Sequence, residues 1–239
     1  MVLARPRAIL FDFGNTLLHE GPTDFLAGAG AVLALAREAP GCTADVLANA
    51  MSDLMADLDP RRFAAQIELP PETVWRLIYD PLGLAFDHEP ATIEWAFWSA
   101  ATSWTPEPGI EPVLRLLDAH HLKCAVLSNT MFRSHIIARQ LATSGLGPFH
   151  FVMASSEEIL RKPHARLFRR AVQRIGENAR DVWFVGDSLE YDMKGAAESG
   201  LVPIWYRGQA VVRGVQYGAR AVTTWDEFGT LLADTLRAT

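Results

Sequence analysis

The chain has 239 residues, of which 49% are hydrophobic and 21% charged, and its formal net charge at pH 7 is −6. This composition is typical of a globular protein with a sizeable core, and it lacks the clustered basic face of a nucleic-acid-binding protein. The sequence contains no apolar stretch long enough for a membrane helix, and its N-terminus lacks the apolar centre of a signal peptide. The two cysteines, Cys42 and Cys124, form no Cys-x-x-Cys pair and favour free thiols in a reducing cytoplasm.

The first predicted element is a buried strand over residues 8–12 that ends in one carboxylate. The run Ala8-Ile9-Leu10-Phe11 is apolar, Asp12 follows it, and Gly14 and Asn15 favour a turn. A short apolar run between turn signals is typical of a strand in a parallel sheet, and ligands bind beyond the carboxyl ends of such strands. Asp12 is therefore a candidate site residue, with capping of the turn as the simpler alternative.

Residues 18–104 predict an all-helical insert of the size of a small bundle. Ala, Leu, Met and Trp dominate this stretch, and β-branched runs are scarce. Predicted helices cover residues 29–39, a segment that Thr43 caps and that runs to Leu58, a segment that begins at Pro71, and a segment that Thr92 caps.

After a linker at residues 105–109, predicted strands and helices alternate. The strands cover residues 123–128, 149–154, 181–187, 202–206 and 221–224. The helices cover residues 111–120, 133–142, 164–175, 195–199 and 225–238. This alternation predicts an α/β fold, in which residues 1–17 and 105–239 form a Rossmann-like, doubly wound parallel sheet around the inserted helical domain.

Four polar clusters follow the predicted strands or precede helices. They are Asp12, Ser128-Asn129-Thr130, Arg161-Lys162-Pro163-His164, and Gly186-Asp187-Ser188 with Asp192. A carboxylate, a hydroxyl, an ammonium and further acids are the groups that phosphoryl transfer through an aspartyl-phosphate requires, with Mg²⁺ on the oxygen ligands. Each residue taken singly has a structural explanation as a cap or a solvated side chain. Their joint occurrence favours a site.

In their order along the chain, these clusters resemble the four motifs of the haloacid dehalogenase-like (HAD) hydrolase superfamily. Asp12-Phe13-Gly14-Asn15-Thr16 resembles the first motif, Asp-x-Asp-x-Thr, and Leu127-Ser128-Asn129 the second. Lys162-Pro163 resembles the third, and Gly186-Asp187-Ser188 with Asp192 the fourth. The resemblance covers the α/β core, and the insert resembles the family's helical cap.

The resemblance implies a magnesium-dependent phosphatase that acts on a small phosphorylated metabolite. It implies that Asp12 is the nucleophile and that Ser128, Asn129 and Lys162 bind the phosphoryl group. It further implies a magnesium ion on Asp12, the backbone carbonyl of Gly14, Asp187 and Asp192.

Gly14 departs from the family pattern, which places a second aspartate there as the acid and base. Three nearby residues are candidate replacements: His19, Glu20 and Glu190. His19 has the most suitable unperturbed pKa, although His19-Glu20 more simply begins an exposed connection. We expect Gly14→Asp to raise phosphatase activity.

Two alternatives follow from the same departure. In the first, the chain is a 2-haloacid dehalogenase-type hydrolase, because the family's dehalogenases also lack the second aspartate. In the second, it is a weakly active or inactive binding or regulatory protein. The acids Asp187 and Asp192 argue against a dehalogenase, because without a metal they would repel an anionic substrate.

Several other side chains carry two interpretations. The tryptophans Trp75, Trp95, Trp98 and Trp104 favour core packing over a wall around the substrate. Arg61-Arg62 favours a solvated turn, and His164 either faces the site or opens its helix. The sequence specifies neither the substrate nor the oligomeric state.

Overall fold

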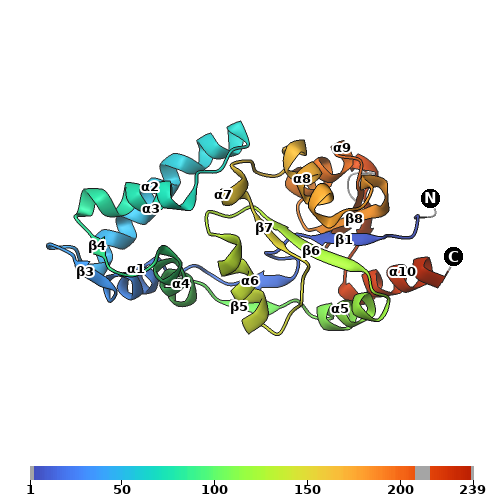
Figure 1. Ribbon diagram of the computed structural model, residues 1–239, viewed down its shortest axis with the longest axis horizontal. Helices are drawn as coiled ribbons and strands as arrows, with labels where there is room; N and C mark the ends of the chain where they lie inside the picture. Colours follow the sequence, from blue (N-terminus) through green and yellow to red (C-terminus); the bar gives the residue numbers. More distant parts are fainter. Residues whose placement is uncertain (1–2, 208–215, 238–239) are drawn as a thin grey trace.

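A computed structural model describes residues 3–207 and 216–237. The predicted α/β core is confirmed, since six parallel strands form one sheet in the order β10-β9-β8-β1-β6-β7 (Figure 1). The strands are β1 (Ala8–Phe11), β6 (Lys123–Ser128), β7 (Val152–Ala154), β8 (Val182–Gly186), β9 (Val202–Tyr206) and β10 (Arg220–Val222).

The central strand β1 holds the start of the predicted site. It pairs with β6 on one side and β8 on the other, with Phe11 opposite both Val126 and Val185. After β7 the chain returns across the sheet and adds β8, β9 and β10 on the other side of β1. Open parallel sheets bind ligands at such a reversal of strand order, beyond the carboxyl ends of the strands.

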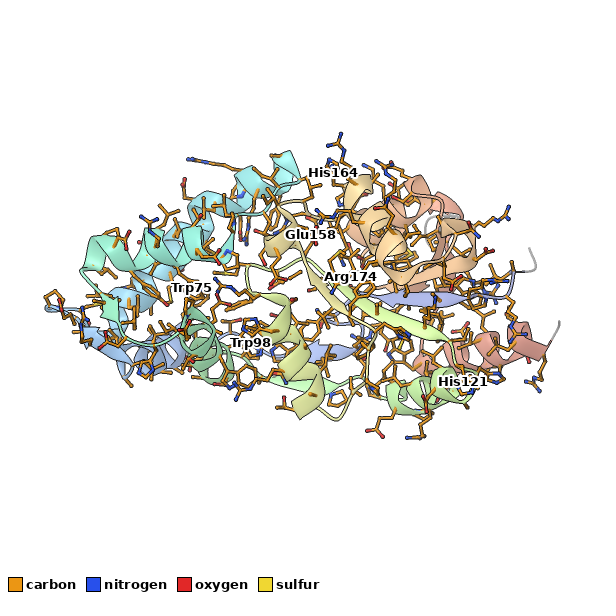
Figure 2. The ribbon with its side chains drawn as sticks, in the orientation of Figure 1. Trp75, Trp98, His121, Glu158, His164 and Arg174 are labelled. Carbon is orange, nitrogen blue, oxygen red and sulfur yellow. The ribbon has the colours of Figure 1, made fainter. Side chains whose placement is uncertain are left out.

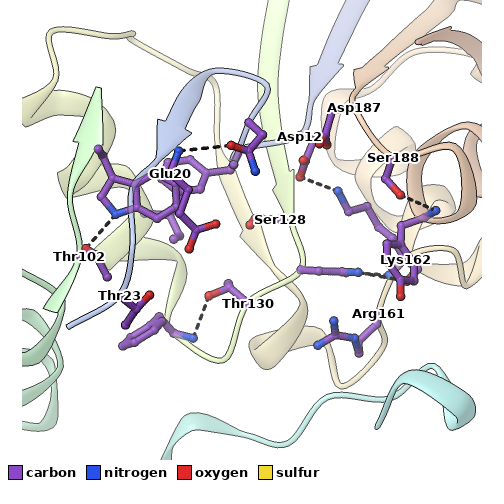
Figure 3. Close-up of a pocket in the computed structure, with 18 of the residues that line it drawn as sticks. Asp12, Glu20, Thr23, Thr102, Ser128, Thr130, Arg161, Lys162, Asp187 and Ser188 are labelled. Atoms are coloured by element: carbon purple, nitrogen blue, oxygen red, sulfur yellow. Dashed lines mark hydrogen bonds and ion pairs between the residues drawn. The ribbon is translucent and has the colours of Figure 1, made fainter. Parts of the chain in front are cut away.

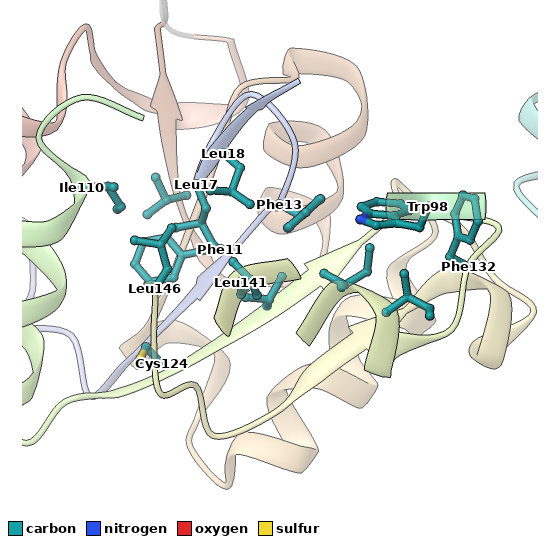
Figure 4. Close-up of a cluster of buried hydrophobic side chains, with 14 of the residues drawn as sticks. Phe11, Phe13, Leu17, Leu18, Trp98, Ile110, Cys124, Phe132, Leu141 and Leu146 are labelled. Atoms are coloured by element: carbon teal, nitrogen blue, oxygen red, sulfur yellow. The ribbon is translucent and has the colours of Figure 1, made fainter. Parts of the chain in front are cut away.

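Helices cover both faces of this sheet, and the side chains of β1 are buried alternately on one face and the other. Ile9 and Phe11 belong to one cluster with α5 (Ile110–Ala119), α6 (Ser134–Thr143) and α10 (Trp225–Arg237), and Figure 4 shows Phe11 there with Ile110 and Leu141. Ala8 and Leu10 belong to the other cluster, with α8 (Ala165–Ile175) and α9 (Lys194–Glu198). The helices after the insert are α5 (Ile110–Ala119), α6 (Ser134–Thr143), α7 (Ser155–Glu158), α8 (Ala165–Ile175), α9 (Lys194–Glu198) and α10 (Trp225–Arg237). Short helical turns are η2 (Ala179–Asp181), η3 (Leu189–Met193) and η4 (Gln216–Gly218).

The insert is mainly helical but not all-helical. Its helices are α1 (Phe25–Leu33), α2 (Ala44–Ala65), α3 (Pro71–Tyr79), η1 (Asp80–Leu82) and α4 (Pro90–Ala101). The strands β3 (Ala36–Glu38) and β4 (Ala85–Phe86) form an antiparallel pair. Beside this pair, the guanidinium of Arg37 lies 2.8 Å from the carboxylate of Asp87. The predicted helix over residues 29–39 therefore ends early, at Leu33, because the chain turns into β3.

Two of the predicted helix starts in the insert have different outcomes. The hydroxyl of Thr43 accepts a hydrogen bond from the N–H of Val46 at 3.3 Å, which confirms the cap of α2. The predicted cap at Thr92 is wrong, because α4 begins two residues earlier, at Pro90. Proline suits a first helical position, where its missing N–H has no partner to lose.

The insert lies at the carboxyl end of the sheet and is tied to the core at several points (Figure 1). The chain enters through β2 (Leu18–Glu20) and leaves through β5 (Trp104–Pro106), which pair antiparallel. The indole N–H of Trp98 in α4 donates a hydrogen bond to Gln140 in α6 at 2.9 Å. Among the described helices, none has the length and apolar character needed to cross a membrane.

Candidate active site

The carboxyl ends of the strands bring the predicted clusters together around one cavity of about 580 Å³ (Figure 3). Asp12 follows β1, Ser128 ends β6, and Asp187 follows β8. All the predicted site residues line this cavity: Asp12, Gly14, Ser128, Asn129, Lys162, Asp187 and Asp192. The sheet topology thus joins residues that are up to 180 positions apart in the chain.

The ammonium group of Lys162 is buried between two carboxylates. Its Nζ lies 2.6 Å from Oδ1 of Asp12 and 2.6 Å from Oδ1 of Asp192. Burial by itself would lower the pKa of Lys162, but the attraction of Asp12 and Asp192 outweighs that effect, so the pKa is raised. The lysine therefore carries its charge at neutral pH.

Three carboxylates converge on this lysine. Asp12, Asp187 and Asp192 each offer an oxygen, and these oxygens lie within 4.8 Å of one another. Burial raises the pKa of Asp187 to about 6, and the charge of Asp12 adds to the shift. Burial also raises the pKa of Asp192 to about 7, against the attraction of Lys162. One ammonium does not balance three acids, and a set of oxygen donors fits a hard divalent cation such as Mg²⁺.

The position of Asp192 depends on the turn that follows β8. The N–H of Ser188 donates a hydrogen bond to Oδ2 of Asp192 at 3.0 Å, and the hydroxyl of Ser188 accepts one from the N–H of Tyr191 at 3.1 Å. A Cβ on Gly186 would overlap the Asp192 carboxylate. The Gly-Asp pair at the strand end therefore has a steric reason, since only glycine allows this close approach.

Asn129 contacts the main chain of Lys162. Its Nδ2 donates a hydrogen bond to the Lys162 carbonyl at 3.1 Å, and its Oδ1 accepts one from the Lys162 N–H at 2.8 Å. Both polar groups of the amide thus hold the backbone that carries the buried ammonium.

Comparison with known proteins agrees with this arrangement. The family model for haloacid dehalogenase-like hydrolases matches residues 6–200, which include every residue of the cavity named so far. The chain belongs to this family.

Curated relatives of this HAD-like hydrolase share part of its length. The glyceraldehyde 3-phosphate phosphatase of Methanocaldococcus jannaschii is 31% identical over 100 residues, which cover 41% of this chain and 43% of that protein. The pyrimidine 5'-nucleotidase YjjG of Escherichia coli is 30% identical over 120 residues, covering 49% of this chain and 52% of that protein. The chain thus spans about half the length of the curated relatives it matches.

Solved structures share the fold over nearly the whole chain. A HAD phosphatase from Thermococcus onnurineus has a TM-score of 0.61 at 19% identity and covers 94% of this chain and 97% of its own. A 2-haloacid dehalogenase from Pseudomonas syringae has a TM-score of 0.58 at 20% identity and covers 97% of this chain and 99% of its own. Because phosphatases and dehalogenases both appear, the fold alone does not distinguish the two reactions.

The place beside Gly14 is taken by a carboxylate from another element. A Cβ on Gly14 would lie 3.7 Å from Oε2 of Glu20 and 3.7 Å from the ring of Trp104. Glu20 lines the cavity, whereas His19 and Glu190 are not among the described lining residues. The imidazole Nδ1 of His19 instead lies 3.8 Å from Oε1 of Glu107. Burial raises the pKa of Glu20, and the nearby charge of Asp12 adds to that shift.

The tryptophans divide between the two interpretations. Trp75 is buried in the insert, as the core interpretation predicts, and does not line this cavity (Figure 2). Trp98 and Trp104 stack at a centroid distance of 5.3 Å and also line the cavity, so they serve both the core and the wall. The aromatic lining consists of Phe13, Phe25, Phe63, Phe97, Trp98, Trp104, Phe132 and Tyr191.

An ion-pair cluster at the rim of the cavity is absent from the sequence-based predictions. Glu68, on the segment between α2 and α3, is buried and pairs with Arg161 and, at 2.8 Å, with Arg62. The predicted turn is wrong for Arg61 and Arg62, because both lie in α2, which continues to Ala65. The side chain of Arg61 is solvated as predicted, whereas that of Arg62 is only 13% exposed. No local sequence pattern predicts this cluster, because its members come from both the insert and the core.

His164 belongs to its helix. Its Nδ1 accepts a hydrogen bond from the N–H of Arg166 at 3.2 Å, which caps α8 (Figure 2). Of the two interpretations, the structure therefore supports the one in which His164 opens the helix.

Proposed function

We propose that this HAD-like hydrolase is a magnesium-dependent phosphatase that acts on small phosphorylated metabolites through an aspartyl-phosphate on Asp12. The observation that carries the proposal is the buried contact between Asp12 and Lys162, at 2.6 Å, beside Asp187 and Asp192. This is the set of charges that an anionic phosphoryl group and a divalent cation need in order to approach a carboxylate nucleophile.

The residues divide the work of the first step. A free oxygen of Asp12 attacks phosphorus, while Lys162 holds the carboxylate in place and offsets the negative charge of the phosphoryl group. The hydroxyl of Ser128, at the end of β6, binds a phosphoryl oxygen. Positioning and charge compensation supply most of the rate in such a reaction.

The carboxylates of Asp12, Asp187 and Asp192 and the carbonyl of Gly14 are the groups proposed to hold Mg²⁺. The ion, when bound, offsets negative charge on the phosphoryl oxygens. Ser188 and Gly186 keep Asp192 in position through the hydrogen bond and the close approach described above.

The matched relatives support phosphate esters as the substrate class. One is named for a triose phosphate and another for pyrimidine 5'-nucleotides. Both matches cover about half of the relatives, so we carry over the class of substrate and no individual compound. The cavity, with its polar floor and aromatic wall, accommodates a leaving group larger than the phosphate itself.

The second candidate is a 2-haloacid dehalogenase. The absence of a carboxylate at Gly14 favours it, because attack on carbon needs no acid for the halide. The positions of Asp187 and Asp192 weigh against it. Two further carboxylates within 4.8 Å of the nucleophile repel the carboxylate of a haloacid.

A screen of phosphate esters with and without Mg²⁺, run beside a chloride-release assay on 2-haloacids, separates these functions. We expect phosphate release that requires Mg²⁺ and falls to background in Asp12→Asn, because an amide is a poor nucleophile. Asp53→Asn, an exposed position on α2, is the matched control and should keep full activity. Metal-independent chloride release would establish the dehalogenase instead, and silence in both assays would favour a binding or regulatory role.

A further inference from the structure

We propose that Glu20 is the catalytic acid and base of this site and acts from the space beside Gly14. The inference rests on the proposed phosphatase function and adds to it a residue that lies outside the four motifs. Of the three candidate replacements drawn from the sequence, it selects Glu20 rather than His19, whose unperturbed pKa is the most suitable.

The backbone at Glu20 is fixed to the loop that carries the nucleophile. The N–H of Glu20 donates a hydrogen bond to Oδ1 of Asn15 at 3.3 Å, and the N–H of Asn15 donates one to the carbonyl of Leu18 at 2.7 Å. On its other side, Glu20 pairs with Trp104 across β2 and β5. The backbone of Glu20 is therefore held from two sides, next to the loop that carries the nucleophile.

The Glu20 carboxylate lies beside the place that a side chain on Gly14 would enter. The Glu20 carboxylate oxygen and the Trp104 ring each lie 3.7 Å from a Cβ built on Gly14, an ordinary packing distance. Gly14 has no positive φ, so its backbone does not demand glycine. A glycine at position 14 therefore leaves room for a carboxyl group that arrives from β2.

The surroundings suit proton transfer to a leaving group. Figure 3 shows the Glu20 side chain in the cavity, on the insert side of Asp12. Glu20 itself is an exposed residue that lines the cavity, next to Phe13 and Trp104, whose ring centroids lie 4.7 Å apart. An acid must lie within reach of the leaving oxygen, and Glu20 lines the cavity, whereas His19 lies outside its described lining and contacts Glu107.

The two steps balance as follows. In the first, an Asp12 oxygen forms a bond to phosphorus, the bond from phosphorus to the leaving oxygen breaks with its electron pair, and the Glu20 proton passes to that oxygen to give an alcohol. In the second, the Glu20 carboxylate takes a proton from water, the water oxygen bonds to phosphorus, and the electron pair of the broken bond returns to Asp12. The products are the alcohol and inorganic phosphate, and Glu20 regains its proton.

The test compares two leaving groups in the full-length protein with Mg²⁺. In Glu20→Gln, kcat/KM for phenyl phosphate should fall about 10²–10⁴-fold, because phenoxide leaves poorly without a proton. For p-nitrophenyl phosphate, whose leaving group is acidic, kcat/KM should fall less than 10-fold, since that constant reports the steps up to loss of the leaving group. Slow hydrolysis of the aspartyl-phosphate should then produce a burst of nitrophenol.

Two further variants complete the experiment. His19→Gln is the matched control, because its side chain is 56% exposed and turned to Glu107, and it should stay within about 2-fold of the wild type for both substrates. Adding Gly14→Asp to Glu20→Gln should restore activity on phenyl phosphate at least 10-fold, since it returns a carboxyl group to the same space.

The outcomes separate this inference from the proposed function. If the wild type releases phosphate but Glu20→Gln, folded by circular dichroism, loses the same factor for both substrates or loses nothing, Glu20 is not the acid. A His19→Gln variant with the leaving-group dependence would assign the role to His19 and overturn the inference. A wild type that hydrolyses no phosphate ester overturns the proposed function itself.

Discussion

At the scale of single residues, the site is a problem of charge compensation in a buried place. Lys162 is 3% exposed and lies between Asp12 and Asp192, and Asp187 adds a third carboxylate. Burying like charges together is costly unless each has a partner. The hydrogen bond from the Ser188 N–H fixes the position of Asp192, and the two hydrogen bonds between the Asn129 amide and the Lys162 main chain fix the Lys162 backbone. The polar atoms next to the reacting groups are thus held before a substrate arrives.

The glycine at the end of β8 offers a sharp test of this packing. In Gly186→Ala, the added methyl group overlaps the Asp192 carboxylate and must displace it. We expect a loss of about 1–3 kcal/mol in the free energy of unfolding and a higher Mg²⁺ concentration for half-maximal phosphate release. Urea unfolding and a Mg²⁺ titration of activity measure the two effects.

The control for this substitution is a second glycine. Gly30 in α1 has open space around its Cβ position, so Gly30→Ala should raise the free energy of unfolding by about 0.5–1 kcal/mol and leave the Mg²⁺ titration unchanged. A Gly186→Ala protein with unchanged Mg²⁺ dependence would contradict the role assigned to the close approach.

At the scale of elements, the insert and the core meet through a short antiparallel bridge as well as through β2 and β5. The N–H of Glu68 donates to the carbonyl of Ile159 at 2.9 Å, and the N–H of Arg161 donates to the carbonyl of Gln66 at 3.0 Å. The buried pair between Glu68 and Arg161 lies on this bridge. Because Arg161 also lines the cavity and precedes Lys162, the bridge connects the position of the insert to the third motif.

A double-mutant cycle measures the strength of this connection. Glu68→Gln leaves the buried guanidinium of Arg161 without its carboxylate and should cost about 3–5 kcal/mol of unfolding free energy. Glu68→Gln combined with Arg161→Met should cost less than the sum of the single changes, because contacting residues are coupled. Urea unfolding gives all four values.

An exposed pair on α2 provides the comparison for that cycle. Asp57 and Arg61 are 55% and 74% exposed, so Asp57→Asn should cost only about 0.3–0.5 kcal/mol. Strict additivity of the Glu68 and Arg161 changes would mean that the two side chains act independently and that the bridge gains nothing from their pairing.

At the scale of the whole molecule, the sequence predicts what local patterns determine. Apolar runs such as Ala8–Phe11 specify the strands, their order with helices specifies a parallel sheet, and parallel strands bring their carboxyl ends to one edge. The seven predicted residues therefore meet in one cavity. What the sequence does not specify are contacts between elements distant in the chain. Glu68 meets Arg161 only after the insert docks.

The same physics explains the errors within elements. Residues 34–39 have helical composition, yet β3 forms because it finds a partner in β4 across the insert. Thr92 is a good cap by type, but Pro90 fits a first helical turn and precedes it in the chain. In both cases a residue has the local preference that its type predicts, but a neighbouring strand pair or helix start is more favourable.

The charge imbalance of the site predicts how metal ions change the stability of the whole protein. Mg²⁺ that binds the folded state alone adds about 2.7 kcal/mol at a concentration of 100 Kd. For a chain of this length, each kcal/mol of added stability raises Tm by about 2–4 °C. We expect this rise at pH 8 in excess MgCl₂, its loss on adding EDTA, and no rise in KCl of equal ionic strength.

The variant Asp187→Asn should be more stable than the wild type without Mg²⁺ and should gain little stability when Mg²⁺ is added. Burial and Asp12 raise the folded-state pKa of Asp187 to about 6, above its unfolded value, so its ionisation removes stability as the pH rises through this range. The neutral amide is free of that cost, and in EDTA the variant should be more stable than the wild type at pH 8, by a margin that shrinks as the pH approaches 4. It should also show little stabilisation by Mg²⁺, because one of the three carboxylates has gone. Melting curves at both pH values, with Asp53→Asn as the exposed control, measure the effect.

A variant less stable than the wild type in EDTA at pH 8 would mean that Asp187 stabilises the fold without a metal. The carboxylate cluster would then be a structural feature rather than a binding site.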